Sequence, residues 1–205
     1  PRPSFLAVSR PPQPGDLIAD RYELEELVGT GGMSSVFRAH DRQLERRVAI
    51  KLLHEHYAGD PEYLERFRRE ARAVARLSHP HIVEVVDFQV SEGGSPYLVM
   101  EFLDGQDLAD RLRERKRLPV IAALRVIAEM AEALDCAHAS GVVHRDLKPE
   151  NLLYVTREPD SELVLADFGI AKHLDSPDGV LKTMAGSFGY AAPEVMLKRG
   201  HSKPV

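Results

Sequence analysis

Short apolar runs separated by polar turns make up the first half of the chain. Apolar runs lie on both sides of a glycine cluster at 29–32, over residues 22–39, a pattern typical of two strands joined by a turn. Apolar, β-branched runs predict further strands at 47–53, 82–90 and 96–102. The first half is therefore expected to consist mainly of strands.

Apolar residues at helical spacing predict one helix within this half and two helices after it. The first helix is expected to begin at Asp60 and Pro61, a capping residue followed by a first-turn proline. Its apolar stripe consists of Leu64, Phe67, Ala71, Val74 and Leu77. The later helices are expected at 108–117 and 119–140, the second ending at Gly141. Strands followed by helices predict a two-lobed α+β fold.

The two later helices differ in their side chains. Helix 119–140 is apolar, and one side of it is formed by Leu124, Ile127, Ala131 and Leu134. Segment 108–117 is basic, and we expect a solvated face there, with contact to an acidic partner segment as the alternative. Its charged residues are Arg111, Arg113, Arg115, Lys116 and Arg117.

Composition narrows the class of protein. A chain of 205 residues that is 43% hydrophobic and 29% charged can bury a sizeable core, so it is expected to be globular. Its net charge of -5 argues against a generally basic nucleic-acid binder. The one cysteine, Cys136, excludes an internal disulfide and fits a reducing compartment, and we interpret it as a small apolar helix residue rather than a reactive thiol.

The N-terminal residues and the hydropathy of the chain indicate where in the cell the protein is expected. Residues 1–20 contain five prolines and are expected to form an extended tail. Prolines also interrupt the apolar stretch 5–8, so no secretion signal is predicted, and no run of 18 apolar residues exists to span a membrane. We expect a cytoplasmic protein, which segments outside this chain could anchor to a membrane, and the first residue, Pro1, indicates a chain that starts partway along a gene product.

Candidate chemistry is concentrated in segment 143–151, between two apolar runs. Asp146 can accept a hydroxyl proton, Lys148 can lie against a transferring phosphate, and Asn151 offers an oxygen to a hard cation such as magnesium. Pro149 restricts the backbone, which predicts a rigid loop. An ordinary solvated turn is the alternative for these residues taken alone.

The string His-Arg-Asp-Leu-Lys-Pro-Glu-Asn at 144–151 resembles the catalytic loop of the protein kinases, most closely their bacterial Ser/Thr branch. Three further motifs fit the resemblance, Val-Ala-Ile-Lys at 48–51, Asp-Phe-Gly at 167–169 and Ala-Pro-Glu at 192–194. It covers about residues 20–205 and implies an N-lobe and hinge at 21–103 and a partial C-lobe at 104–205. The N-lobe would be an antiparallel sheet with one main helix, and the C-lobe would be mostly helical.

The resemblance implies a non-specific serine/threonine protein kinase that transfers the γ-phosphoryl of ATP to protein hydroxyls, with Mg²⁺ or Mn²⁺ held by Asn151 and Asp167. Its catalytic residues would be Asp146, Lys148, Lys51 and Glu70, the last being the ion-pair partner of Lys51. An exposed strand position is the ordinary alternative for Lys51. ATP would contact Gly29, Thr30, Gly31, Gly32, Met33, Ser34, Val36, Ala49, Lys51, Met100, Glu101, Leu103 and Leu153. All these groups are expected to converge on one metal-bound triphosphate.

Two departures from the family pattern bear on the site. Ser34 stands where the glycine loop usually has its third glycine. The interval from Asn151 to Asp167 is a few residues longer than usual, and we assign the excess to the turn 158–161, where it is not expected to affect the chemistry.

The pair His79 and His81 around Pro80 favours a turn over a metal site, since no Cys or carboxylate lies at ligand spacing.

Residues 170–190 resemble the family's activation segment. The resemblance implies that Ser176 and Thr183 are candidate phosphoacceptors, that Arg145 could bind phosphate on Thr183, and that Ser187 helps to fix the catalytic aspartate. Autophosphorylation there would involve a kinase–kinase dimer.

The chain ends eleven residues beyond Glu194 and contains no tryptophan, whereas the family continues with an Asp-x-Trp-x-x-Gly motif. We therefore expect a kinase truncated within its catalytic domain, and residues 1–205 alone to be unstable or inactive. Two other functions stay open, a nucleotide-binding scaffold of the same fold and a small-molecule phosphotransferase.

Overall fold

The computed structural model describes residues 10–32, 34–54, 61–91, 95–168 and 190. Packing of the chain divides it into two compact units. Unit 1 comprises Pro1–Ser78 and Val83–Phe102, and unit 2 comprises His79–Ile82 and Leu103–Val205.

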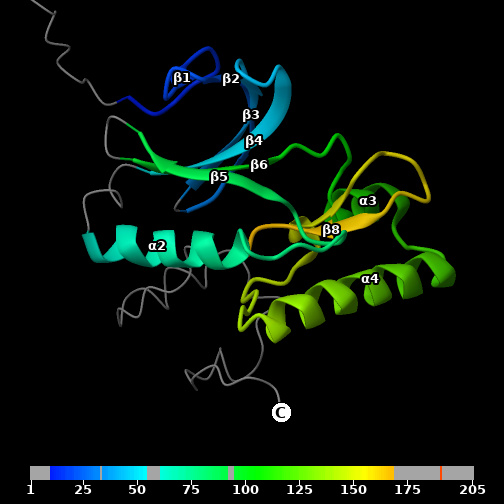
Figure 1. The fold of residues 1–205 in the computed structure, drawn as a ribbon. Coiled ribbons are helices and arrows are strands. Elements are labelled where there is room, and N and C mark those ends of the chain that lie inside the picture. Colours follow the sequence, from blue (N-terminus) through cyan, green and yellow to red (C-terminus); the bar gives the residue numbers. More distant parts are fainter. Residues whose placement is uncertain (1–9, 33, 55–60, 92–94, 169–189, 191–205) are drawn as a thin grey trace, which may run out of the picture. The chain divides into compact units, whose positions relative to one another are not determined.

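Unit 1 is built on a six-stranded sheet whose pairings are all antiparallel, in the order β1-β2-β3-β4-β6-β5. Its strands are β1 Leu17–Ile18, β2 Tyr22–Thr30, β3 Ser34–Asp41, β4 Arg46–Leu53, β5 Val85–Val90 and β6 Pro96–Glu101. Helix α2, Pro61–Val74, lies along β5 (Figure 1). The antiparallel N-lobe sheet with one main helix is thus confirmed, and the helix begins at Pro61 as predicted.

Strand alternation gives the sheet one fully buried face. Its core is formed by Tyr22, Leu24, Phe37, Ala39, Val48, Ile50, Leu52, Tyr97 and Val99. The Tyr22 and Tyr97 rings pack edge to face with centroids 6.2 Å apart, an arrangement that aromatic pairs favour. Burial raises the pKa of Tyr97 to about 12. The opposite face of β3, β4 and β6 carries the candidate nucleotide residues described below, of which Val36 and Ala49 are half-buried and Lys51 and Met100 are buried.

A partly buried ion pair ties β3 to the turn before β2. Arg21 donates to Asp41 through both Nε, at 2.9 Å, and Nη2, at 2.6 Å, and the Asp41 side chain is fully buried. The backbone N–H groups of Gln43 and Leu44 donate to the same carboxylate. Chiefly because Arg21 donates to it, the pKa of Asp41 falls from 3.8 to about 2.

Replacing Asp41 with asparagine is expected to lower the free energy of unfolding at pH 7 by about 2 kcal/mol, since each tenfold change in acidity is worth about 1.4 kcal/mol. The folded pKa is the lower one, so this stabilisation is complete above about pH 4 and is lost as the pH falls through about 2. Urea unfolding of both proteins between pH 7 and pH 2 measures the difference. The 93% exposed Asp160 provides the control Asp160→Asn, and an equal loss in both variants would refute the assignment.

The described part of unit 2 combines two helices with a short hairpin. The elements are α3 Leu108–Arg115, α4 Val120–Ala139, the 3-10 turn η1 Pro149–Asn151, and the strands β7 Leu152–Tyr154 and β8 Leu163–Leu165. The two strands pair antiparallel, and the hairpin packs on α4 and α3. Gly141, at φ +75°, ends the α4 segment in a conformation that favours glycine.

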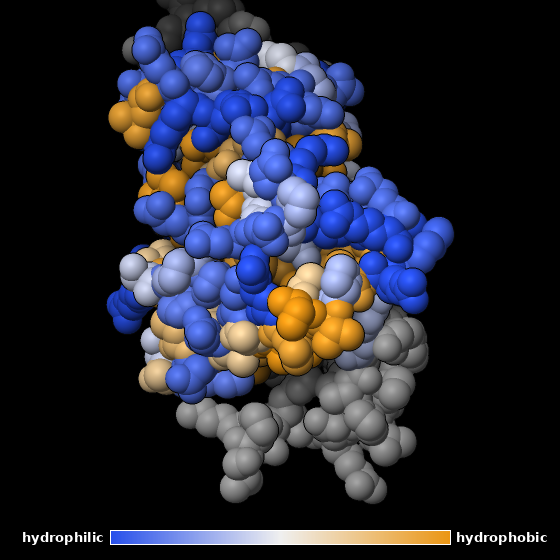
Figure 2. Space-filling view, turned by 90° about the vertical axis from the view of Figure 1, so that its right-hand side faces the viewer, coloured by the Kyte–Doolittle hydropathy of each residue, from blue (hydrophilic) through white to orange (hydrophobic). Residues whose placement is uncertain are grey.

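The apolar side that we predicted for α4 does not coincide with the side of the helix that is buried. The residues of α4 that are buried are Val126, Ala133 and Ala137. Leu124 and Ile127, which we assigned to the apolar side, are more than half exposed, as are Val120 and Ile121. Figure 2 shows hydrophobic side chains gathered on the molecular surface. Both sides of this helix are apolar, so its hydropathy pattern could not indicate which side packs.

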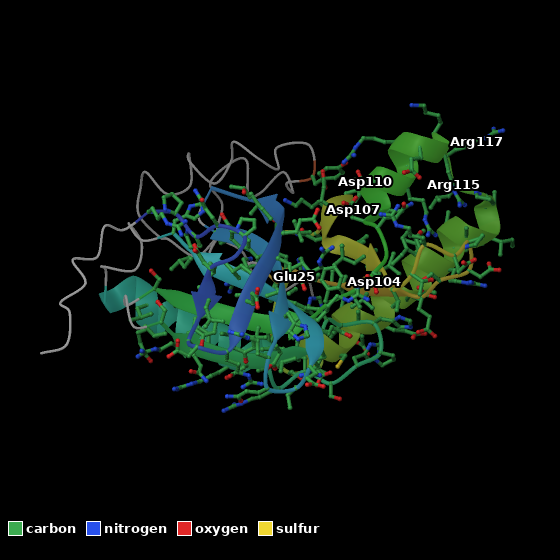
Figure 3. The ribbon with its side chains drawn as sticks, turned by 90° about the horizontal axis from the view of Figure 1, so that it is seen from above. Glu25, Asp104, Asp107, Asp110, Arg115 and Arg117 are labelled. Atoms are coloured by element: carbon green, nitrogen blue, oxygen red, sulfur yellow. The ribbon has the colours of Figure 1, made fainter. Side chains whose placement is uncertain are left out.

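Charges on α3 follow the helix dipole. Asp107 caps the helix by accepting from the N–H of Asp110 at 2.7 Å. Figure 3 shows the aspartates at the start of α3 and Arg115 and Arg117 at its other end, the distribution that a helix dipole favours. Burial raises the pKa of the Asp107 carboxyl. In the described part of the chain, no helix has both the length and the apolarity needed to cross a membrane.

The solvated face predicted for segment 108–117 is wrong at Arg111. This side chain is only 2% exposed, whereas Arg113, Arg115, Lys116 and Arg117 are exposed as predicted. Arg111 turns inward because its guanidinium has partners in the hairpin that the helix alone does not reveal.

Candidate functional site

The glycine turn joins β2 to β3 in unit 1. Gly29, the first glycine, lies opposite Val36, and Thr30 lies opposite Ser35. The N–H of Gly31 donates to the Ser34 carbonyl at 2.8 Å. A side chain added at Gly29 or Gly32 would meet no atom within 4 Å. These glycines therefore leave open space, which is what close approach of a phosphate to the backbone requires.

Ser34 is accommodated without backbone strain. It begins β3, its side chain is nearly buried, and its φ is not positive. A glycine is therefore not needed at this position to form the turn. Ser35, next to it, hydrogen-bonds from Oγ to Nε2 of His54 at 3.0 Å, which attaches the turn to the end of β4.

Four candidate nucleotide residues share the face of the sheet opposite its core. Val36 lies directly opposite Lys51, and Ala49 lies directly opposite Met100. Directly opposed residues project to the same face, and so do residues two apart on one strand, so all four side chains emerge together. Lys51 is 6% exposed, which removes the ordinary alternative of a solvated strand lysine. An apolar platform with one buried cation suits a nucleotide base followed by its phosphates.

The hinge candidates differ in what their backbones can offer. The N–H of Glu101 donates to the carbonyl of Glu84 at 3.0 Å, and its carboxylate accepts from the N–H of Glu84 at 2.8 Å. Leu103 is the first residue of unit 2 after β6. Met33 lies outside the described residues, and Glu70 lies in α2 with a side chain that the structure does not describe.

The catalytic-loop candidates come together in unit 2. Lys148 Nζ lies 3.3 Å from Asp146 Oδ2, and Asn151 Nδ2 donates to the backbone carbonyl of Asp146 at 2.7 Å. The same nitrogen is 3.3 Å from Asp146 Oδ2. Asp146 and Asn151 are 7% and 5% exposed, so both are held in place by packing as well as by hydrogen bonds. An ordinary solvated turn does not describe these two residues.

His144 links this loop to the strand that leads to Asp167. Its Nδ1 accepts from the Asp146 N–H at 3.3 Å, so its Nε2 carries the proton and donates to the Ala166 carbonyl at 2.9 Å. The ring also packs on Phe168, with centroids 4.7 Å apart. Our sequence interpretation gave His144 no separate role, although its position two residues before Asp146 was the available signal.

The hairpin brings the two candidate metal ligands to one end of unit 2. Asn151 precedes β7 and Asp167 follows β8, and the N–H of Ala166 donates to the Asn151 carbonyl at 2.9 Å. An amide oxygen and a carboxylate form the hard-oxygen donor set that Mg²⁺ takes when phosphates supply further ligands. In the described ranges, no group of three His, Cys, Asp or Glu residues is placed to hold a metal.

Two residues flanking this cluster have strained backbones. Arg145 has φ +66° and Asp167 has φ +57°, a left-handed conformation that costs non-glycine residues of order 1–3 kcal/mol. Such strain persists where the surrounding structure requires it, and it concentrates at functional sites. The regulatory candidates Ser176, Thr183 and Ser187 lie outside the described residues. Leu153, a nucleotide candidate, is half-buried in β7 and bridges to Asp107.

Comparison with protein families gives one match, to the protein kinase domain over residues 22–205. Among curated proteins, the chain is 43% identical over 195 residues to serine/threonine-protein kinase PknA of Mycobacterium tuberculosis, covering 93% of this chain and 44% of the relative. It is 45% identical over 186 residues to a calcium/calmodulin-dependent protein kinase of Metarhizium anisopliae, covering 90% of this chain and 47% of the relative.

Solved structures show the same fold. The kinase domain of Mycobacterium tuberculosis PknI matches with a TM-score of 0.71 and 31% identity, over 93% of this chain and 69% of that one. Rad53 in complex with AMP-PNP matches with a TM-score of 0.70 and 28% identity, over 86% of this chain and 43% of that one. The chain thus spans less than half the length of the curated relatives it matches.

Proposed function

Because this chain belongs to the protein kinase family, we propose that the protein carrying it transfers the γ-phosphoryl group of ATP to serine and threonine hydroxyls of proteins. The observation that carries the proposal is the cluster of Asp146, Lys148 and Asn151 in one loop, in which the aspartate and the asparagine are buried. The names of its relatives, which include bacterial Ser/Thr kinases, support the same choice of substrate.

In this proposal each residue of the loop acts on the reacting groups. Asp146 orients the substrate hydroxyl and accepts its proton at a carboxylate oxygen. Lys148, whose ammonium lies beside that carboxylate, offsets negative charge on the group in transfer. The Asn151 amide, by donating to the Asp146 carbonyl, holds the aspartate in position. Positioning and electrostatics supply most of the acceleration because the transition state of phosphoryl transfer is loose.

Separate groups of residues are proposed to bind the nucleotide and the metal. Lys51 and the glycine turn would bind the phosphates, and Ala49 and Met100 would pack on the base. Mg²⁺ or Mn²⁺ would be held by Asn151 and Asp167 and, when bound, would neutralise charge on the phosphate oxygens. The Lys51–Glu70 pair and the hinge contacts at Glu101 and Leu103 are further parts of the proposal.

Regulation by autophosphorylation is also proposed. The acceptors would be Ser176 and Thr183, modified within a dimer of kinases, and Arg145 would bind the phosphate through charge-assisted hydrogen bonds. Incubating the protein with ATP and locating phosphate by mass spectrometry tests this. The absence of phosphate from both residues in an active preparation would contradict it.

The proposed activity is tested by incubating the intact protein with radiolabelled ATP, Mg²⁺ and a mixed protein substrate. We expect label on serine and threonine. Transfer only to aminoglycosides or choline would instead indicate a small-molecule phosphotransferase. A scaffold role would be indicated if no transfer occurs and Asp146→Asn leaves the biological effect intact.

A further inference from the structure

Arg111 is a buried cation, and in the described part of the chain the hydrogen bonds and the ring contact of its guanidinium lie in the β7–β8 hairpin. Its guanidinium lies 3.5 Å from the centroid of the Tyr154 ring, at the end of β7. Its Nη2 donates to the Glu158 carbonyl at 3.1 Å, and its Nη1 donates to the Pro159 carbonyl at 3.4 Å. One planar side chain therefore joins the last residue of a strand to the turn that follows it.

Burying this charge is costly, because none of the carboxylates in the described ranges forms an ion pair with Arg111. Methionine or leucine could fill a core position of this kind without taking a charge out of water. Unlike these residues, arginine has a planar guanidinium group, which carries several hydrogen-bond donors and can stack on an aromatic ring. Its contacts with the hairpin are thus the property that distinguishes Arg111 from an apolar core residue.

The turn that Arg111 holds is the segment 158–161, to which we assigned the excess length expected between Asn151 and Asp167. It is ordered by its own hydrogen bonds, with the Ser161 hydroxyl accepting from the Thr156 N–H at 2.8 Å. A second arginine, Arg125 of α4, donates to the Asp160 carbonyl at 3.4 Å. The added turn is thus attached to both helices of unit 2, and Figure 1 shows it beside α3.

Because the hairpin is short, the conformation of its turn affects the positions of the residues at its open end. Each strand has three residues, paired from Leu152 with Leu165 to Tyr154 with Leu163. Asn151 and Asp167 lie just beyond these strands at the open end. A tilt or slip of either strand at the turn changes the separation of the two candidate metal ligands, since Asn151 adjoins β7 and only Ala166 lies between β8 and Asp167.

We infer that Arg111 is a positioning residue for the metal-dependent step of nucleotide binding, acting on Asn151 and Asp167 through the β7–β8 hairpin. This inference rests on the proposed function, and it revises our expectation that the added turn has no effect on the chemistry. Partners that orient metal ligands typically contribute 10- to 100-fold to metal affinity. Because Arg111 acts through a hairpin rather than on a ligand directly, we expect about the lower value.

The test compares Arg111→Met with Arg113→Met in the intact protein. Arg113 lies on the same helix with a 69% exposed side chain, so it is a matched control. Affinity for a fluorescent ATP analogue is measured by titration, once with Mg²⁺ and once with EDTA, together with the melting temperature. The expected result is a loss of about tenfold for Arg111→Met in Mg²⁺ only, with Arg113→Met unchanged in both.

If Arg111 has a purely structural role, its replacement would lower the melting temperature. Both affinities, measured well below that temperature, would then keep their wild-type values. That outcome, or an equal loss with Mg²⁺ and with EDTA, overturns the inference. If Arg111→Met does not fold, the comparison uses Arg111→Lys, whose ammonium keeps the charge but lacks the planar fork, and the same criteria apply. A wild-type affinity that Mg²⁺ does not change overturns the proposed function, and this inference with it.

Discussion

Replacing Asp146 with asparagine is expected to lower the rate of phosphoryl transfer by about 100- to 10,000-fold, the range that a positioned general base contributes. The amide has nearly the same shape as the carboxylate, but it cannot take up the hydroxyl proton. The hydrogen bond from Asn151 to the Asp146 backbone carbonyl does not depend on the side chain, so the loop should keep its conformation.

Steady-state kinetics with a peptide substrate measure this effect. We expect kcat to fall while KM for ATP stays within about twofold, because an interaction made only in the transition state contributes to kcat and not to ground-state binding. Asp135→Asn, on the exposed surface of α4, is the control and should behave as wild type. If kcat for Asp146→Asn stayed within tenfold of wild type, Asp146 would not be the base.

Replacing Gly105 with alanine is expected to lower the free energy of unfolding of unit 2 by at least about 3 kcal/mol, at the upper end of the usual cost of overpacking. A Cβ at this position would lie 1.7 Å from the carbonyl oxygen of Tyr154 and 2.6 Å from its carbonyl carbon. Both are backbone atoms of β7, so no side-chain rotation can relieve the clash.

The close approach of Gly105 to β7 allows backbone hydrogen bonds between the two segments. The N–H of Tyr154 donates to the Gln106 carbonyl at 3.0 Å, and Asp107 bridges to Leu153. Segment 105–107 therefore runs against β7 as an additional backbone partner, and only glycine allows the two backbones to approach so closely. Separating them would break both hydrogen-bonded contacts.

Urea unfolding of the intact protein measures the stability of Gly105→Ala. Gly32→Ala is the matched control for stability, since a Cβ there would meet no atom within 4 Å and the glycine has no positive φ. A loss of less than about 1 kcal/mol at Gly105 would mean that β7 does not pack on this segment as described.

Much of the fold was predictable from the sequence. Apolar runs on both sides of the glycine cluster in 22–39 and the β-branched run at 47–53 predicted strands that are present. The helix after Pro61 was predicted because a proline at this position matches the start of a helix. Asp146, Lys148 and Asn151 stand within six positions of one another, so chain connectivity alone keeps them close.

Other features depend on contacts between segments that are distant along the chain. The pattern of 108–117 could not reveal that Arg111 is buried, because its partners Glu158 and Pro159 lie 47 and 48 positions away. The pattern of α4 is apolar on two sides, so only the position of the β7–β8 hairpin decided that Ala133 and Ala137 pack while Leu124 does not. The face of the sheet shared by Val36 and Lys51 likewise follows from the register of β3 with β4.

The sequence by itself determined the local conformations and the chemistry carried by the loop 144–151, since these depend on neighbouring residues and on side-chain type. Only the tertiary structure decided that Lys51 is buried, that Ala166 is hydrogen-bonded to Asn151, and that an arginine holds the hairpin turn. Burial and hydrogen bonding between distant segments are properties of the packed chain, and no local pattern encodes which partner each segment meets.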